Sequence, residues 1–168
     1  MNPAPAVRRA DLADAARLRA LRLEMLADAP LAYLERLDEA AARPHAQFRA
    51  TLAQRLADPA AVLYVADARG TLVGQAGVRT VPGRPEVCLV YAVYVSPPWR
   101  RTGLNGRLLA ALGDWARSRG RGVLELEVVT SNNRAVRAYR SVGFIDTGIR
   151  VPHPTTPLLT EMTMVRPA

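Results

Sequence analysis

Two adjacent arginines, Arg100 and Arg101, and a nearby glycine, Gly103, stand where a leucine-rich helix is predicted to begin, in the stretch VSPPWRRTGLNGRLLAALGDWA. The first turn of a helix leaves amide hydrogens without carbonyl partners and carries the positive end of the helix dipole. Glycine lets a ligand approach the backbone, and arginines add charge-assisted hydrogen bonds. The pattern predicts a site for a phosphate or pyrophosphate group.

The loop differs from two common nucleotide sites. No lysine follows the glycines, as a Walker-type site requires, and the third glycine of a dinucleotide fingerprint is missing. A purely structural interpretation is also open, in which Gly103 shapes a turn and the arginines are solvated. The elements around the loop must decide between the two.

Changes in hydrophobic period predict the elements that would position this loop. Helical spacing predicts a helix capped near Asp11, one from Pro44 to Leu56, one from Leu104, and a short one over 132–143. Apolar runs predict a strand before Asp11, a hairpin over 61–79, and strands over 86–95, 123–129 and 158–165. The predicted fold is α/β (α+β), a mostly antiparallel sheet flanked by helices.

Length and composition limit the class of protein. A chain of 168 residues is about the length of one domain and should form one hydrophobic core. No apolar run approaches the roughly 20 residues of a membrane span, and residues 1–18 lack the apolar centre of a signal peptide. We expect a cytoplasmic protein without a membrane partner.

The residues that often bind metals or form disulfides are few. Cys88, the single cysteine, lies in the apolar run VCLVYAVYV, which predicts a small buried hydrophobe and not a nucleophile. His45 and His153 lack metal-ligand spacing. We therefore expect neither a disulfide nor a metal.

A formal charge of +8 raises the alternative of a nucleic-acid partner. All 23 basic residues are arginine, however, and they are spread along the chain, while aromatic residues make up only 5%. This composition indicates coding bias as much as selection for a polyanion, so no nucleic acid is expected. A nucleic-acid binder would show steeply salt-dependent binding.

Two stretches together resemble the GNAT superfamily of acyl-CoA-dependent N-acetyltransferases, and the resemblance covers nearly the whole chain. VYVSPPWRRTGLNGRLL resembles the strand, proline and R-x-x-G-x-[GA] loop that cradles the pyrophosphate of coenzyme A in that family. LELEVVTSNNRAVRAYRSVGF resembles its later strand, asparagine, short helix, tyrosine and Gly-Phe ending. The resemblance implies a single N-acetyltransferase domain over 1–168, a strongly twisted sheet, and acetyl-CoA as co-substrate.

The resemblance also implies a set of site residues. The implied cofactor-binding residues are Val93, Val95, Arg100, Arg101, Thr102, Gly103, Leu104, Asn105, Gly106, Asn132 and Tyr139. Val93 and Val95 would use their backbone toward the acetyl group and pantetheine, and Asn132 would lie beside the pantetheine arm. Asn105 departs from the family's Gly or Ala, which puts its effect on the affinity for the cofactor in question.

The implied reaction is attack of a neutral amine on a thioester. Tyr139 matches the tyrosine that often serves as general acid, and a phenol with a pKa near ~10 is protonated at neutral pH. The general base is less defined: Glu86 is the candidate, Glu125 and Glu127 lie on the next strand, and a water chain could replace a side chain.

In this family the acceptor wall usually comes from the first two helices and the last hairpin, here LADAPLAYLERLDE and GIRVPHPTTPLL. Tyr33 is the candidate substrate residue, and Glu35, Asp38 and Glu39 would make the first segment acidic, which suits a cationic amine. An exposed charged helix face is the alternative interpretation. The strand 158–165 could contribute to a homodimer, and a catalytically idle acyl-CoA-binding module also fits the unassigned base.

Overall fold

The computed structural model describes residues 4–168. Its strands and helices follow the order that the sequence predicts, with one additional helix and one additional strand. The strands are β1 (Ala6–Arg9), β2 (Ala61–Ala68), β3 (Thr71–Val81), β4 (Arg84–Val95), β5 (Val123–Val129), β6 (Ile145–Pro152) and β7 (Thr160–Pro167). The α-helices are α1 (Ala15–Asp28), α2 (Leu37–Ala42), α3 (His45–Ala57), α4 (Leu104–Ser118) and α5 (Asn133–Arg140). Short 3₁₀ turns, Leu12–Asp14 and Pro97–Trp99, precede α1 and α4.

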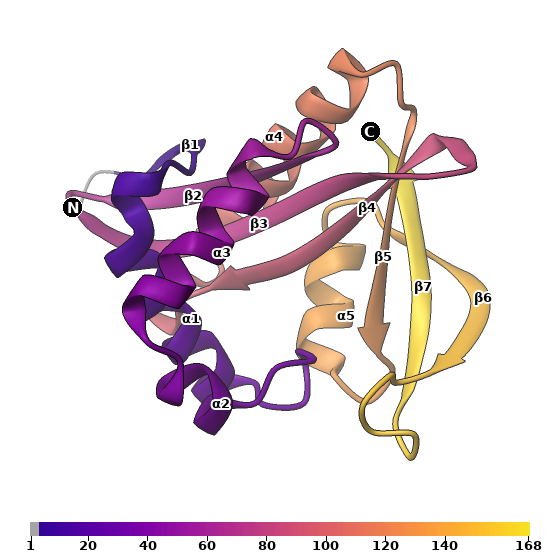
Figure 1. Cartoon of the computed structure of the whole chain (residues 1–168). Helices are drawn as coiled ribbons and strands as arrows, with labels where there is room; N and C mark the ends of the chain where they lie inside the picture. The colour runs from indigo at the N-terminus through magenta and orange to yellow at the C-terminus, as the bar shows by residue number, and fades with distance from the viewer. Residues whose placement is uncertain (1–3) are drawn as a thin grey trace.

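The strands form one seven-stranded sheet in the order β1-β2-β3-β4-β5-β7-β6 (Figure 1). Every neighbouring pair is antiparallel except β4 and β5, which are parallel. The predicted hairpin is β2–β3, turning at Arg69 and Gly70, which both have positive φ. The predicted mostly antiparallel α/β fold is confirmed.

The two additions are α2 and β6. α2 begins after the loop that ends α1 and has only six residues, too few to show a clear periodic pattern in the sequence. β6 is an edge strand whose residues are mostly exposed, and it carries Gly148 at φ 83°. Because both faces of β6 are largely exposed, apolar and polar residues do not alternate along it, and the sequence does not indicate a strand there.

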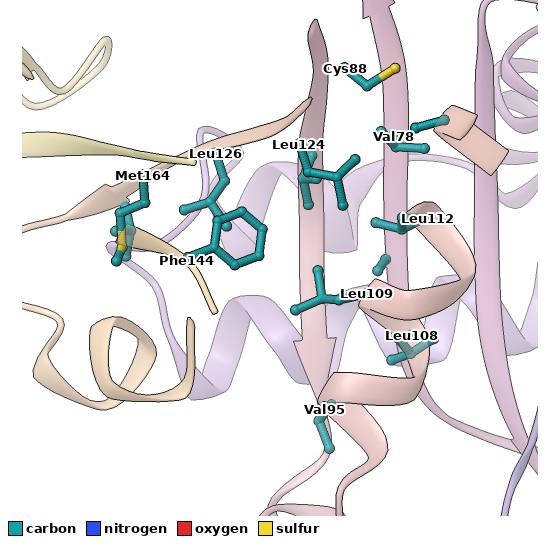
Figure 2. Close-up of a cluster of buried hydrophobic side chains, with 14 of the residues drawn as sticks. Val78, Cys88, Val95, Leu108, Leu109, Leu112, Leu124, Leu126, Phe144 and Met164 are labelled. Atoms are coloured by element: carbon teal, nitrogen blue, oxygen red, sulfur yellow. The ribbon is translucent and has the colours of Figure 1, made fainter. Parts of the chain in front are cut away.

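Helices cover both faces of the sheet and create two cores. The sheet lies between the two cores, so successive residues of β2 belong to different ones. Val65 packs with α1 and α3, whereas Ala66 packs with α4 on the other face. Figure 2 shows the second core, in which leucines of α4 pack beside Leu124, Leu126, Phe144 and Met164. Cys88 belongs to this core, and burial raises the pKa of its thiol, as expected for a small buried hydrophobe.

The central strands separate after a short parallel contact. β4 and β5 pair only over Val87–Leu89 and Val123–Glu125, and beyond this contact they diverge (Figure 1). β4 also carries a bulge, because its register with β3 shifts between Gln75 and Gly77, opposite Ala92. Ala92 has φ 51°, a conformation that costs free energy for any residue with a Cβ.

Candidate active site

A cavity of about 740 Å³ lies where β4 and β5 diverge. Its walls come from Val90–Val95 of β4, 126–129 of β5, the loop before α4, the N-terminal half of the chain near Tyr33, and α5. Residues of the two diverging strands therefore share the cavity wall with residues of helices and loops.

The loop before α4 presents open backbone amides to this cavity. Gly103 is the N-cap of α4 at φ 82°, and no side chain caps the helix. The first intrahelical bond is donated by the Arg107 amide to the Gly103 carbonyl, 3.1 Å away, so the amides of 104–106 have no intrahelical acceptor. A Cβ at Gly103 would meet nothing within 4 Å, which leaves room for a ligand. This arrangement suits an anion.

The adjacent arginines Arg100 and Arg101 differ in their surroundings. The Arg100 Nε donates to the Val95 carbonyl at 3.0 Å, its guanidinium pairs with Asp28, and it lies 5.8 Å from the ring centre of Tyr94. Arg101 lines the cavity and forms no ion pair or side-chain hydrogen bond within residues 4–168. Arg100 is therefore held against the protein, and Arg101 is available to a ligand.

The structure brings most of the predicted cofactor residues to the cavity. Those that line it are Val93, Val95, Arg100, Arg101, Gly103, Asn105, Gly106, Asn132 and Tyr139. Thr102 and Leu104 do not line it. The Thr102 hydroxyl donates to the Trp99 carbonyl at 2.7 Å, and the Leu104 side chain is buried in the core. Both side chains therefore stabilise the conformation of the loop without facing the cavity.

Asn132 and Tyr139 approach the cavity from α5. The Asn132 side chain accepts the Ala135 amide at 3.1 Å and so caps α5, which also fixes its place in the wall. Tyr139 is half-buried and packs edge to face on Phe144, with ring centres 5.7 Å apart. Burial, and the nearby Tyr33 phenol, raise the pKa of Tyr139 above its usual value. The phenol is therefore protonated at neutral pH and can donate a proton.

Tyr33 lies in the loop after α1 and contacts the bulged part of β4. Its hydroxyl donates to the Val93 carbonyl at 2.9 Å, and burial raises its pKa to about 12. The guanidinium of Arg22 lies over its ring at 5.6 Å. Tyr33 thus closes the cavity on the side of α1, opposite α5.

The predicted base Glu86 does not reach the cavity. It is exposed near the start of β4, close to Gly122, at the other end of the strand from Val95. Glu125 is also engaged elsewhere, since it accepts two hydrogen bonds from Arg84. Their placement argues against both as the base.

Two other carboxylates, Glu127 and Glu161, do line the cavity. Glu127 opposes Thr163, and Glu161 opposes Val129, so the carboxylates lie diagonally on the same face of β5 and β7. Glu161 is 8% exposed, and burial raises its pKa. In the sequence, the only feature that marks Glu161 is its acidic side chain within the apolar alternation of TEMTMV.

The segment predicted to form the acceptor wall after the first helix contributes Tyr33 to the cavity, but its acidic residues Glu35, Asp38 and Glu39 do not line it. Glu35 pairs with Arg22 of α1 at 2.8 Å and with Arg43 at 2.5 Å, and Asp38 pairs with Arg36 at 2.9 Å. Ion pairs therefore compensate most of its charge. The alternative interpretation, an exposed charged helix face, fits Asp38 and Glu39 of α2, whereas Glu35 lies before α2 with its side chain only 16% exposed.

Comparison with protein-family models assigns the chain. The model described as the acetyltransferase (GNAT) family matches residues 24–144, a range that includes the loop before α4, both divergent strands and α5. The chain belongs to this family. The resemblance expected from the sequence is thereby confirmed.

Relatives in the GNAT family have different acceptors. The N-alpha-acetyltransferase RimI of Mycobacterium tuberculosis is 42% identical over 58% of this chain and 60% of its own length, so the chain spans less than two thirds of that relative. Aminoglycoside N(6')-acetyltransferase type 1 of Stenotrophomonas maltophilia is 33% identical over 86% of this chain and 88% of its own. A Salmonella typhimurium acetyltransferase solved with its cofactor acetyl-CoA superposes at TM-score 0.72 and 25% identity, covering 97% of this chain and 93% of that one.

Two further structural features bear on the class of protein. In residues 4–168, no helix combines the length and apolar character needed to cross a membrane. Within the same range, no group of three or more His, Cys, Asp and Glu side chains is arranged to hold a metal ion.

Proposed function

We propose that residues 1–168 form one N-acetyltransferase domain that transfers the acetyl group of acetyl-CoA to a primary amine. The observation that carries this proposal is the cavity where β4 and β5 diverge, whose wall includes both the uncapped start of α4 and the carboxylates of Glu127 and Glu161. Tyr139 lines the same cavity, and we assign to it the proton that a leaving thiolate would need. We also propose a cytoplasmic location, as the sequence analysis expected.

The acetyl donor fits the loop side of the cavity. The amides of 104–106 and Arg101, which has no ion pair within residues 4–168, suit a pyrophosphate. Gly106 adds no side chain to the wall beside them, and a Cβ there would lie 3.5 Å from Val142 Cγ1. Tyr33 and Arg100 already use the carbonyls of Val93 and Val95 as acceptors. Pantetheine would therefore contact the remaining backbone groups of this edge of β4. Asn105, at the wall, would lie beside the pyrophosphate.

The proton transfers follow from the chemistry of aminolysis. An ammonium first loses a proton, and its nitrogen then attacks the thioester carbonyl; the cationic nitrogen of the adduct loses a second proton as the C–S bond breaks, which leaves the amide and the thiolate. Tyr139 donates its phenolic proton to the thiolate and regains a proton from the amine nitrogen through solvent. We assign the first proton of the amine to Glu127 or Glu161, directly or through one water, because both line the cavity and Glu86 does not.

The acceptor is a cationic amine before it reacts, and the carboxylates of Glu127 and Glu161 would attract it. The named activities of the relatives, on an α-amino group and on an aminoglycoside, both concern such amines. We therefore propose a small-molecule or peptide amino group as the acceptor.

The first experiment is an acetylation assay in which acetyl-CoA is incubated with kanamycin or with peptides that have a free α-amino group. Release of coenzyme A and gain of one acetyl group by mass spectrometry are expected for at least one amine. Tyr139→Phe should lower kcat by about 10²-fold or more and leave the KM for acetyl-CoA little changed, because the ring still packs on Phe144.

Other outcomes of the assay favour other functions. Binding of acetyl-CoA without turnover of any amine would favour the idle acyl-CoA-binding module. Turnover that Tyr139→Phe leaves unchanged would contradict the role of the phenol. Failure to bind acetyl-CoA, together with salt-dependent binding of nucleic acid, would favour a nucleic-acid-binding protein, the alternative that the formal charge of +8 raises.

A further inference from the structure

His153 is a buried histidine next to the cavity that the proposed reaction does not yet use. It lies in the turn between β6 and β7, and only 2% of the residue is exposed. Its backbone amide donates to the Leu159 carbonyl at 2.9 Å, and the Leu159 amide donates to the Thr156 carbonyl at 2.8 Å. These bonds close the turn around the imidazole and fix its position.

The turn also fixes which ring nitrogen carries the proton. The backbone amide of Thr156 donates to Nδ1 at 3.1 Å, and the Thr155 amide approaches the same atom at 3.4 Å. A proton on Nδ1 would place two donors against each other, so Nδ1 is the acceptor and Nε2 carries the proton.

Nε2 has no hydrogen-bond partner within residues 4–168, although it is buried. A buried N–H without an acceptor costs free energy. The nearest carboxylate oxygen is Oε1 of Glu161, 4.0 Å away. A hydrogen bond needs about 2.9 Å, so a small rotation of the Glu161 side chain would complete one.

Two ionisable groups face Glu161 among the described residues. They are His153, from the β6–β7 turn, and Glu127, from β5. The residue opposite Glu161 on β6 is Val151, which carries no charge. Burial and Glu127 favour the protonated form of Glu161, whereas a positive charge or a hydrogen-bond donor on the His153 side chain favours its carboxylate form. The balance between these neighbours sets the charge of Glu161 at the cavity.

We propose that His153 is a positioning residue, whose Nε2–H donates to Oε1 of Glu161 and holds that carboxylate ionised and oriented to take the proton of the acceptor amine. This inference rests on the proposed acetyltransferase function. The ammonium loses a proton to Glu161, which becomes a neutral carboxylic acid, while the amine keeps the electron pair with which it attacks. The carboxyl proton then leaves to solvent. His153 keeps its own proton throughout, because Nδ1 is committed to the turn.

The test uses two substitutions that separate the roles of the ring nitrogens. In H153N the amide oxygen can still accept the Thr156 amide, but no donor reaches Glu161. In H153Q the longer side chain can place an amide donor near the former Nε2. H45N, at an exposed position of α3, is the control.

The first readout needs no acceptor. Nitrogen-15 NMR of the protein, which has two histidines, should show the Nε2–H tautomer for His153. Carbon-13 titration should show that H153N raises the pKa of Glu161 by on the order of one pH unit, because a donor to the carboxylate is lost. H153Q should return the titration toward wild type, and H45N should not move it. An Nδ1–H tautomer, or an unchanged titration in H153N, would overturn the proposal.

The second readout uses any amine that the wild type acetylates. The acidic limb of kcat/KM should move to higher pH in H153N by the same shift as the Glu161 titration, with a loss of up to about tenfold on that limb that disappears at alkaline pH, where Glu161 is ionised in both proteins. Combining H153N with E161Q should add no further loss. A loss that is the same at every pH would overturn the proposal. If no amine reacts with wild type, the function fails, while the titration still tests the pair.

Discussion

Asp14 is a fully buried carboxylate whose ion pairs join three elements. Arg8 of β1 donates to its two oxygens at 2.7 and 2.8 Å, Arg17 of α1 also pairs with it, and both arginines reach Asp67 of β2. The hydrogen bonds from Arg8 lower the pKa of Asp14 from 3.8 to about 2. Because burial alone would raise this pKa, the pairing with arginine dominates.

This shift predicts a pH-dependent contribution to stability. The pKa of Asp14 is lower in the folded chain, so its contribution is complete above about pH 4 and is lost as pH falls toward 2. Asp14→Asn should lower the free energy of unfolding by about 2 kcal/mol at neutral pH and by progressively less below pH 4. Urea denaturation at several pH values measures this difference.

Asp114→Asn is the control for this experiment, because it removes an exposed ion pair with Arg117. It should change the free energy of unfolding by less than about 1 kcal/mol. An equal loss in Asp14→Asn at acidic and neutral pH would indicate a packing defect and not the loss of an ionised pair.

At the scale of single residues, the motif around Gly103 could be found from the sequence, but the role of each residue in it could not. Arg100 and Arg101 are identical in type and adjacent, yet only Arg100 has Asp28 and the Val95 carbonyl as partners. Those partners are distant in sequence or belong to the backbone. No pattern within the motif separates the two arginines.

At the scale of elements, β4 shapes the site through its bulge and its divergence from β5. The bulge places Ala92 at φ 51°, and both neighbouring carbonyls receive side-chain donors, Gln75 to Ala92 at 3.2 Å and Tyr33 to Val93 at 2.9 Å. These contacts hold an unfavourable backbone conformation in place at the centre of the cavity wall.

The backbone conformation at Ala92 can be tested by substitution. Ala92→Gly should leave the free energy of unfolding unchanged or raise it by up to about 1 kcal/mol, because glycine has no Cβ to clash at positive φ. Ala92→Val should lower it by about 1–2 kcal/mol or more, since a branched side chain is less tolerated there. Thermal and urea unfolding measure both changes.

Ala110→Gly, at an exposed position of α4, provides the matched control. It should lower the free energy of unfolding by about 1 kcal/mol, the usual cost of glycine within a helix. A similar loss in Ala92→Gly would contradict the positive φ at this position.

The sequence predicted the elements with strong periodicity and missed the rest. α4 was predictable because leucines recur on one face, and Leu108, Leu109 and Leu112 are indeed buried. The place of Glu161 and His153 was not predictable, because it depends on the register of β7 against β5 and β6. Glu86 was proposed from its nearness to the strand of the motif, but position along β4 decides whether a side chain reaches the cavity.

At the scale of the whole molecule, the cavity where β4 and β5 diverge brings together groups that favour opposite charges. Open amides and Arg101 favour an anion at the start of α4, whereas Glu127 and Glu161 favour a cation on the face of β5 and β7. The formal net charge of +8 does not describe this distribution. Under the proposed function, the first group would bind the anionic acetyl donor and the second the cationic acceptor.

The most direct test of this account is a calorimetric titration of acetyl-CoA into the wild type, Gly106→Trp and Ala110→Trp at physiological salt. Gly106 lines the cavity in the first turn of α4, whereas Ala110 is exposed outside it. The account predicts that wild type and Ala110→Trp bind equally and that Gly106→Trp, while folded, does not bind. Equal binding by all three proteins, or no binding by the wild type, would contradict it.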